Sequence, residues 1–214
     1  NKGKTEKYVI ERNGNEKWKN CKYLGSRLDT EEDIKRRKGL AINAKNKLNH
    51  LFNSKASMKM KIRALNAFVG SIFLYNSEIW TLTSNLEHKI DVFQRLLLRQ
   101  LLKIHYPDRI SNEDLYKRTG IKEKWSITIK KRRLNWLGHL LRLPSETPAQ
   151  KAFDEFLRPV KRPQGRPANT WVGNIMKELK EFNITDIEEA RELARNRDTW
   201  RGVTKLESAE SSRT

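Results

Sequence analysis

The sequence is poor in cysteine, in long apolar runs and in clustered metal ligands. Cys21 is the only cysteine among 214 residues, so no internal disulfide can form, and this favours a reducing intracellular compartment. No apolar run approaches the roughly 20 residues that cross a membrane, so we expect no membrane partner. The four histidines lie far apart, and one cysteine is too few for the usual structural zinc site. These absences argue against disulfide-rich, membrane-spanning and zinc-binding proteins.

Acidic residues are also few compared with basic residues. The chain has 45 Lys and Arg but 26 Asp and Glu, a formal net charge of +19. Residues 30–63 contain ten basic and three acidic residues, and residues 122–142 contain seven and one, whereas residues 176–198 contain five and seven. A surplus of this size repels itself in a compact fold, so a polyanionic partner is expected. Because phosphate backbones are the commonest such partner, the sequence predicts nucleic-acid binding.

The spacing of apolar residues predicts a mainly α fold with a small N-terminal β-hairpin. Residues 7–11 and 18–24 are expected as strands on either side of the turn signal Asn13-Gly14. Helical spacing dominates after about Asp29. The expected helices include a long basic helix over 124–142 and shorter ones near 148–157, 170–182 and 185–197. The expected helix caps are Thr30, Ser57, Ser84, Ser111 and Thr185.

Five stretches of the chain stand out in order. They are Asn1-Lys2-Gly3-Lys4-Thr5-Glu6, Lys22-Tyr23-Leu24-Gly25-Ser26, Leu74-Tyr75-Asn76-Ser77-Glu78-Ile79-Trp80, Arg132-Arg133-Leu134-Asn135-Trp136-Leu137-Gly138-His139-Leu140-Leu141-Arg142-Leu143-Pro144 and Gly165-Arg166-Pro167-Ala168-Asn169-Thr170-Trp171. In this order and at these spacings they resemble the C-terminal part of the reverse transcriptases of non-LTR (LINE-type) retrotransposons. The resemblance extends from Asn1 to about Val203, and the shared order of the motifs makes it specific.

The resemblance implies a division of the chain into five segments. Residues 1–29 would be the end of the palm with the primer-grip hairpin, and residues 30–82 a helical thumb bundle that clasps the template–primer duplex. The rest would be a basic helical C-terminal region over 83–157, a Pro- and Arg-rich linker with two terminal helices over 158–203, and a disordered tail over 204–214. The expected fold is therefore mainly α, with the hairpin followed by the thumb bundle and further C-terminal helices.

The activity implied by the resemblance is RNA-directed DNA polymerisation. The family's metal-binding aspartates belong to palm motifs that would precede Asn1, so no catalytic or metal-binding residue is assigned here. Two Mg ions are expected only in that missing palm, and this chain is expected not to polymerise alone. The implied partners are the RNA template, an RNA–DNA hybrid or target DNA, together with the rest of the polymerase chain.

The second motif would be the primer grip, which holds the primer 3′ end. Its residues are Lys22, Tyr23, Leu24, Gly25 and Ser26. A glycine after two large side chains lets the backbone approach a sugar-phosphate closely. In the alternative interpretation, Tyr23 and Leu24 simply pack the hairpin against the thumb.

Basic side chains in three regions are the candidate phosphate ligands. They are Lys35, Arg36, Lys45, Lys55, Lys59, Lys61 and Arg63 in the thumb, Lys130, Lys131, Arg132, Arg133 and Arg142 in the long helix, and Arg158, Lys161, Arg162 and Arg166 in the linker. Such contacts position a protein without reading sequence. The alternatives are a solubilising helix face and a plain basic linker. The tetrad 130–133 also resembles a nuclear localisation signal, so nuclear and cytoplasmic localisation is expected, and Trp136 is expected in the core.

Two other interpretations remain open at the level of sequence. The first is a free-standing basic nucleic-acid-binding protein, derived from such an element or similar to it. The second is a decayed reading frame of the element. The start at Asn1, without Met, favours a fragment or a processed piece. A nuclease is disfavoured because Asp, Glu and His residues do not converge on a recognisable motif.

Overall fold

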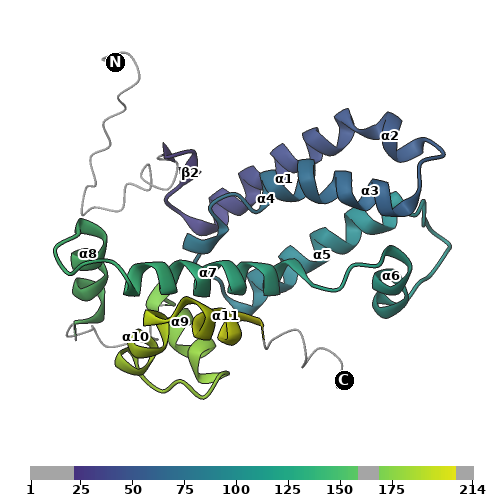
Figure 1. The fold of residues 1–214 in the computed structure, drawn as a ribbon. Helices are drawn as coiled ribbons and strands as arrows, with labels where there is room; N and C mark the ends of the chain where they lie inside the picture. The colour runs from purple at the N-terminus through teal and green to yellow at the C-terminus, as the bar shows by residue number, and fades with distance from the viewer. Residues whose placement is uncertain (1–21, 159–168, 206–214) are drawn as a thin grey trace, which may run out of the picture. The chain divides into compact units, whose positions relative to one another are not determined.

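The computed structural model describes residues 22–158 and 169–205, and this part of the chain is mainly α-helical (Figure 1). The predicted fold class is confirmed. Two short strands, β1 (Lys22–Tyr23) and β2 (Ser26–Arg27), form an antiparallel hairpin in which Lys22 pairs with Arg27 and Tyr23 with Ser26. The predicted strand over 7–11 and the Asn13-Gly14 turn lie outside the described residues.

The predicted strand over 18–24 is wrong at its end. The strand ends at Tyr23, and Leu24 and Gly25 form the turn into β2. Both turn residues have positive φ, which an extended strand does not allow. The described hairpin turns at Leu24 and Gly25, eleven residues after the predicted Asn13-Gly14 turn, which the structure does not test.

The other elements of the described chain are helices joined by loops (Figure 1). They are α1 (Thr30–Lys47), α2 (Asn49–Asn53), α3 (Met58–Ala64), the π-helix η3 (Leu65–Gly70), α4 (Ser71–Phe73), the 3-10 helix η4 (Ser77–Ile79), α5 (Ser84–Leu101), α6 (Asn112–Thr119), α7 (Trp125–Leu141), α8 (Pro148–Leu157), α9 (Trp171–Lys180), α10 (Ile187–Arg195) and α11 (Arg197–Lys205).

Side-chain caps explain where several helices begin. Ser57 and Ser111 each accept a hydrogen bond from the backbone N–H three residues on, as the sequence predicts. The other three predicted caps are displaced by one residue. Thr83 caps α5 in place of Ser84, because its hydroxyl accepts from the N–H of Leu86 at 3.3 Å. Asp29 caps α1 in place of Thr30, and Asp186 caps α10 in place of Thr185. In both cases an aspartate adjoins the threonine, and the carboxylate is the stronger acceptor.

The last helix, α11, was not predicted as a separate element. The sequence suggests one helix over 185–197, but α10 ends before Asn196, whose backbone is extended. The Asn196 side chain then accepts hydrogen bonds from the N–H groups of Asp198 and Thr199 at the start of α11. Asparagine is a favoured N-cap residue, so Asn196 could have indicated the start of a new helix. The helical spacing of apolar residues continues across it and suggests a single helix instead.

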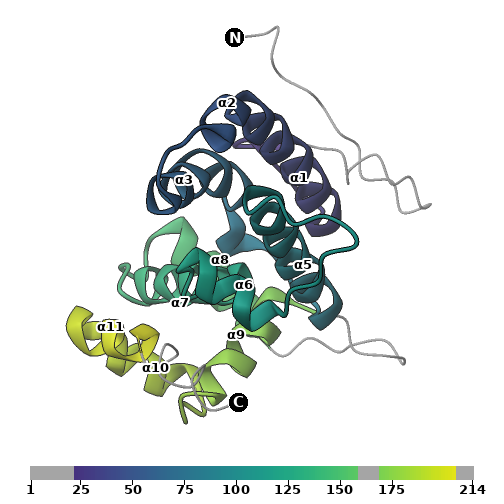
Figure 2. The same cartoon turned by 90° about the vertical axis from the view of Figure 1, so that its right-hand side faces the viewer.

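The chain divides into two compact units. Unit 1 comprises residues 1–76 and 98–120, and unit 2 comprises residues 77–97 and 121–214. In unit 1, α1 runs beside the nearly continuous helix formed by α3, η3 and α4 (Figures 1 and 2). Ala41 of α1 and Leu65, Val69 and Phe73 of the second helix are buried. Their burial holds α1 in place under the hairpin.

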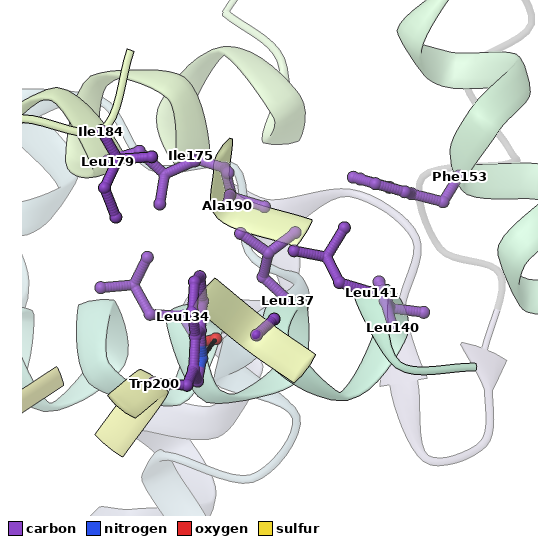
Figure 3. Close-up of a cluster of buried hydrophobic side chains, with 11 residues drawn as sticks. Leu134, Leu137, Leu140, Leu141, Phe153, Ile175, Leu179, Ile184, Ala190 and Trp200 are labelled. Atoms are coloured by element: carbon purple, nitrogen blue, oxygen red, sulfur yellow. Dashed lines mark hydrogen bonds between the residues drawn. The ribbon is translucent and has the colours of Figure 1, made fainter. Parts of the chain in front are cut away.

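Unit 2 has its core between α7 and the three helices α9 to α11. Its buried side chains are Leu134, Leu137, Leu140, Leu141, Phe153, Ile175, Leu179, Ile184, Ala190, Ala194 and Trp200 (Figure 3). Trp200 donates a hydrogen bond from its indole N–H to the carbonyl of Leu134, at 2.9 Å. Gly138 permits this approach, because a Cβ there would lie 2.2 Å from Trp200 Nε1.

Candidate nucleic-acid interface

The turn of the hairpin has an unusual backbone conformation. Leu24 has φ +47° and Gly25 has φ +84°. Two positive φ values are characteristic of type I′ hairpin turns, which favour Asn-Gly or Gly-Gly. A leucine in this conformation costs about 1–2 kcal/mol relative to ordinary backbone. Such a cost persists only when the surroundings hold the turn in place.

Three side chains hold the turn by its carbonyl groups. Arg36 and Arg37 both donate to the carbonyl of Gly25, at 3.0 and 2.6 Å. The Tyr75 hydroxyl donates to the carbonyl of Leu24 at 3.2 Å. We call these three residues the turn clamp. Because two of its donors are charged, the clamp offsets the backbone strain with comparatively strong hydrogen bonds.

A second set of contacts fixes the strand that follows the turn. Arg37 also donates to the Ser26 hydroxyl at 3.2 Å, and the Asn76 amide donates to the same oxygen at 3.2 Å. The backbone N–H of Arg27 donates to Asp33 at 3.0 Å. The hairpin is therefore anchored to α1 on one side and to the end of α4 on the other.

Arg37 is the buried centre of this arrangement. Its guanidinium lies 4.4 Å from the centroid of the Tyr75 ring, and its Nε lies 3.7 Å from the buried carboxylate of Asp33. Burial lowers the pKa of Arg37, and the charge of Asp33 opposes that shift. An arginine stays charged even so. The charged guanidinium stabilises the turn through its hydrogen bond to Gly25 and is buried from solvent.

The side chains of Tyr23, the last residue of β1, and of Leu24, in the turn, are exposed. Tyr23 is 67% exposed and Leu24 is 73% exposed. The alternative in which both pack the hairpin onto the thumb is therefore not supported. Ser26 is buried, Gly25 lies at the turn, and for Lys22 only the backbone pairing is described. The structure thus presents one aromatic and one aliphatic side chain on a rigid, cation-backed turn.

The seven basic residues predicted as thumb ligands fall into three groups. Lys35, Lys55, Lys59 and Arg63 are exposed, although Lys35 also lies 3.9 Å from Glu32. Arg36 and Lys45 are half-buried. Lys61 is buried and donates to the carbonyl of Ser54 at 2.8 Å, so it acts within the fold.

The stretch of chain that carries the four exposed cations lacks acidic residues. No Asp or Glu occurs from residue 34 to residue 77, whereas this stretch carries ten Lys and Arg. The acids of α1 are confined to its first turn, where they favour the helix N-terminus and pair locally. Lys55, Lys59 and Arg63 therefore lie in a stretch of chain whose charges are all positive, which favours contact with an external anion.

The tetrad 130–133 is split by the geometry of α7. Lys130 pairs with Glu181 at 2.8 Å, Lys131 pairs with Glu123, and Arg133 pairs with Glu178. Arg132 is exposed. Consecutive residues on a helix point about 100° apart, so four in a row cannot share one face. The four cations therefore do not lie on one face, and phosphate binding by the accessible members stays a prediction.

Arg133 in particular is not a surface ligand. It is fully buried, pairs with the buried carboxylate of Glu178, and donates to the carbonyl of Trp80 at 3.0 Å. Burial lowers its pKa, and the charge of Glu178 opposes the shift. The prediction that Arg133 contacts phosphate is therefore wrong, because no external phosphate reaches a buried guanidinium.

The remaining predicted ligands lie in unit 2. Arg142 donates to the carbonyl of Ala194 at 3.1 Å and stays half-buried. Arg158 is exposed and pairs with Glu155 at 2.8 Å. Lys161, Arg162 and Arg166 lie outside the described residues.

Sequence reasoning missed two residues of the hairpin site and misplaced one aromatic. Tyr75 and Asn76 hold the hairpin. Both residues belong to the motif 74–80, but the sequence assigns them no role. Trp136 was expected in the core because Leu134 and Leu137 flank it, but it is 38% exposed. Trp136 lies four residues after the exposed Arg132 and therefore on the same side of α7, and this spacing could have predicted its exposure.

Neither a metal cluster nor a membrane span occurs in the part of the chain that the structure describes. No three His, Cys, Asp or Glu side chains there converge on a possible ion site. Among the same residues, no helix is long and apolar enough to cross a membrane.

Known proteins offer one informative similarity. Over 199 aligned residues the chain is 23% identical to an uncharacterized transposon-derived protein of Caenorhabditis elegans, and the alignment covers 88% of this chain and 71% of the worm protein. No protein-family model matches the chain, and no solved structure gives a significant match. The similarity supports a transposon origin for this sequence.

Proposed function

We propose that this chain is the thumb and C-terminal region of the reverse transcriptase of a non-LTR retrotransposon, and that unit 1 holds the end of a template–primer duplex. The order of the five motifs and the similarity to a transposon-derived protein support this proposal. The observation that carries it is the turn clamp, which presents Tyr23 and Leu24 on a strained and anchored turn.

The chemistry of the hairpin suits the end of a nucleic-acid duplex. A tyrosine ring and a leucine side chain can lie against the sugar and the face of a terminal base pair. The exposed cations of α1 and α3 can then contact phosphates further along the backbone. Neither kind of contact reads sequence. A polymerase needs such contacts because it must hold primers of any sequence.

The catalytic chemistry belongs to the rest of the polymerase chain in this proposal. Two Mg ions held by palm aspartates would activate the primer hydroxyl and stabilise the leaving pyrophosphate. The contribution of this chain is binding and positioning.

A comparison of nucleic acids with and without ends tests the proposal. The full 214-residue chain is titrated against a labelled blunt-ended RNA–DNA hybrid, which has duplex ends but no single-stranded overhang, and against a dumbbell of the same length closed by a short loop at each end. We expect tighter binding to the ended hybrid. Equal affinities would contradict an end-holding hairpin and favour a general basic binding protein.

The variant Leu24→Gly removes the exposed side chain of the turn without disturbing the fold. Glycine adopts φ +47° without strain, so the variant is expected to fold normally and to lose part of the preference for the ended hybrid. The matched control is Leu40→Ala, which removes an exposed leucine from α1 in the same unit. A preference unchanged in Leu24→Gly would contradict the assigned role of the turn.

A further inference from the structure

A separate surface on unit 2 combines cations with aromatic rings. Arg132, Asn135, Trp136 and His139 stand at positions i, i+3, i+4 and i+7 of α7, and all four are exposed. This spacing places them on one side of the helix, which we call the α7 outer face. Leu134, Leu137 and Leu141 occupy the opposite side and are buried against α9 to α11 (Figure 3).

The two rings of the outer face lie against each other. The centroids of Trp136 and His139 are 5.3 Å apart, and their planes are tilted by 36°. Trp136 lies against His139, and 38% of its surface is exposed. A large ring that is held in place and partly exposed can stack on a further planar group at little cost in side-chain entropy.

Arginines lie at both ends of this pair of rings. Arg132 precedes Trp136 by one turn, and Arg142 follows His139 by nearly one turn, a span of about 15 Å along the axis. Burial lowers the pKa of Arg142, and the nearby charges of Arg197 and Arg201 lower it further. Arg201 is also paired with the exposed Asp198 at 2.9 Å. Arg142 is half-buried and donates to the carbonyl of Ala194 in α10 at 3.1 Å, so the arginine that the outer face presents is Arg132.

We propose that the α7 outer face binds single-stranded nucleic acid, with Trp136 stacking on an unpaired base and Arg132 contacting an adjoining phosphate. The ligand is a single strand because a base inside a duplex is already stacked on both sides and offers no free face to Trp136. This site lies apart from the hairpin in sequence and needs no duplex end. It therefore goes beyond the proposed function of unit 1.

The test measures binding of the full chain to labelled 12-nucleotide single strands of RNA and of DNA, with the ended RNA–DNA hybrid as the comparison. Trp136→Ala is expected to weaken single-strand binding about fivefold to 150-fold, the range found for loss of one base–aromatic stack. Binding to the ended hybrid is expected to stay within about twofold of the parent chain. The RNA and DNA arms show which single strand is preferred.

Two further variants distinguish stacking from a general loss of structure. Trp136→Phe keeps an aromatic ring and is expected to recover most of the single-strand affinity. Phe156→Ala removes a ring that is 76% exposed on α8 of the same unit, and it is expected to change nothing. Thermal melts of each variant report on folding.

The outcomes separate this site from the hairpin. Loss of single-strand binding in Trp136→Ala but not in Leu24→Gly supports the α7 outer face even if the hairpin proposal fails. Equal single-strand affinity of Trp136→Ala and Phe156→Ala would overturn it, and so would equal losses on single strands and on the ended hybrid.

Discussion

At the scale of single residues, two glycines of this chain are needed for opposite reasons. Gly25 is needed for its backbone conformation, because its φ of +84° suits few other residues, whereas the space around it would admit a methyl group. Gly138 has ordinary helical backbone but no space for a methyl group beside Trp200. The two sites therefore predict different consequences for the same substitution.

Gly25→Ala is expected to lower the free energy of unfolding of unit 1 by about 1–2 kcal/mol, because alanine is strained at positive φ. The matched control is Gly39→Ala, in the middle of α1 with nothing near the added methyl group. That change is expected to stabilise by about 0.5–1 kcal/mol, since alanine favours helix. Urea denaturation followed by circular dichroism measures both, and changes of the same sign would contradict the turn geometry.

Gly138→Ala is expected to destabilise unit 2 by about 2–4 kcal/mol, because the new methyl group displaces Trp200 and breaks its hydrogen bond to Leu134. Near-ultraviolet circular dichroism should report the loss of the tryptophan environment. Gly202→Ala on α11, where the added methyl group meets nothing, serves as the control. An unchanged stability in Gly138→Ala would show that Trp200 does not pack there.

At the scale of elements, α7 shows how a run of like charges is distributed by helix geometry. Lys130 and Lys131 form surface pairs, Arg132 is exposed, and Arg133 is buried with Glu178. Side chains at successive positions therefore have separate roles. Substitutions within the tetrad should affect either binding or stability according to the position changed.

Arg133→Met is expected to cost about 3–5 kcal/mol, because it leaves the carboxylate of Glu178 buried without its partner. Adding Glu178→Leu should recover most of that loss, since an apolar pair needs no hydration. Arg195→Gln breaks the exposed Arg195–Glu192 pair and should cost less than about 0.5 kcal/mol. A denaturation-based double-mutant cycle measures the coupling, and additive losses would contradict the buried pair.

The sequence predicts most elements correctly because their signals are local. Ser57 and Ser111 cap helices where expected, and the long helix over 124–142 corresponds closely to α7. The missed features depend on contacts between segments far apart in the chain. Tyr75 reaches Leu24 across 51 positions, and Arg133 reaches Glu178 across 45. Spacing within one segment does not contain that information, so the turn clamp and the buried ion pair could not be predicted.

At the scale of the whole molecule, the net charge of +19 is the property on which the proposed function depends. In unit 1, four of the predicted phosphate ligands are exposed, and no acid occurs between residues 34 and 77. Each cation that contacts a phosphate releases a counterion, so the strength of binding should depend steeply on salt.

The most direct test of nucleic-acid binding is a salt titration of the 214-residue chain with the ended RNA–DNA hybrid, duplex DNA and single-stranded RNA. We expect the logarithm of the association constant for the hybrid to fall with the logarithm of salt concentration with a slope of about −3.6 or steeper, corresponding to four phosphate contacts. We also expect the hybrid to bind more tightly than duplex DNA. A slope shallower than about −1, or no binding at low salt, would contradict a phosphate-gripping function for this protein.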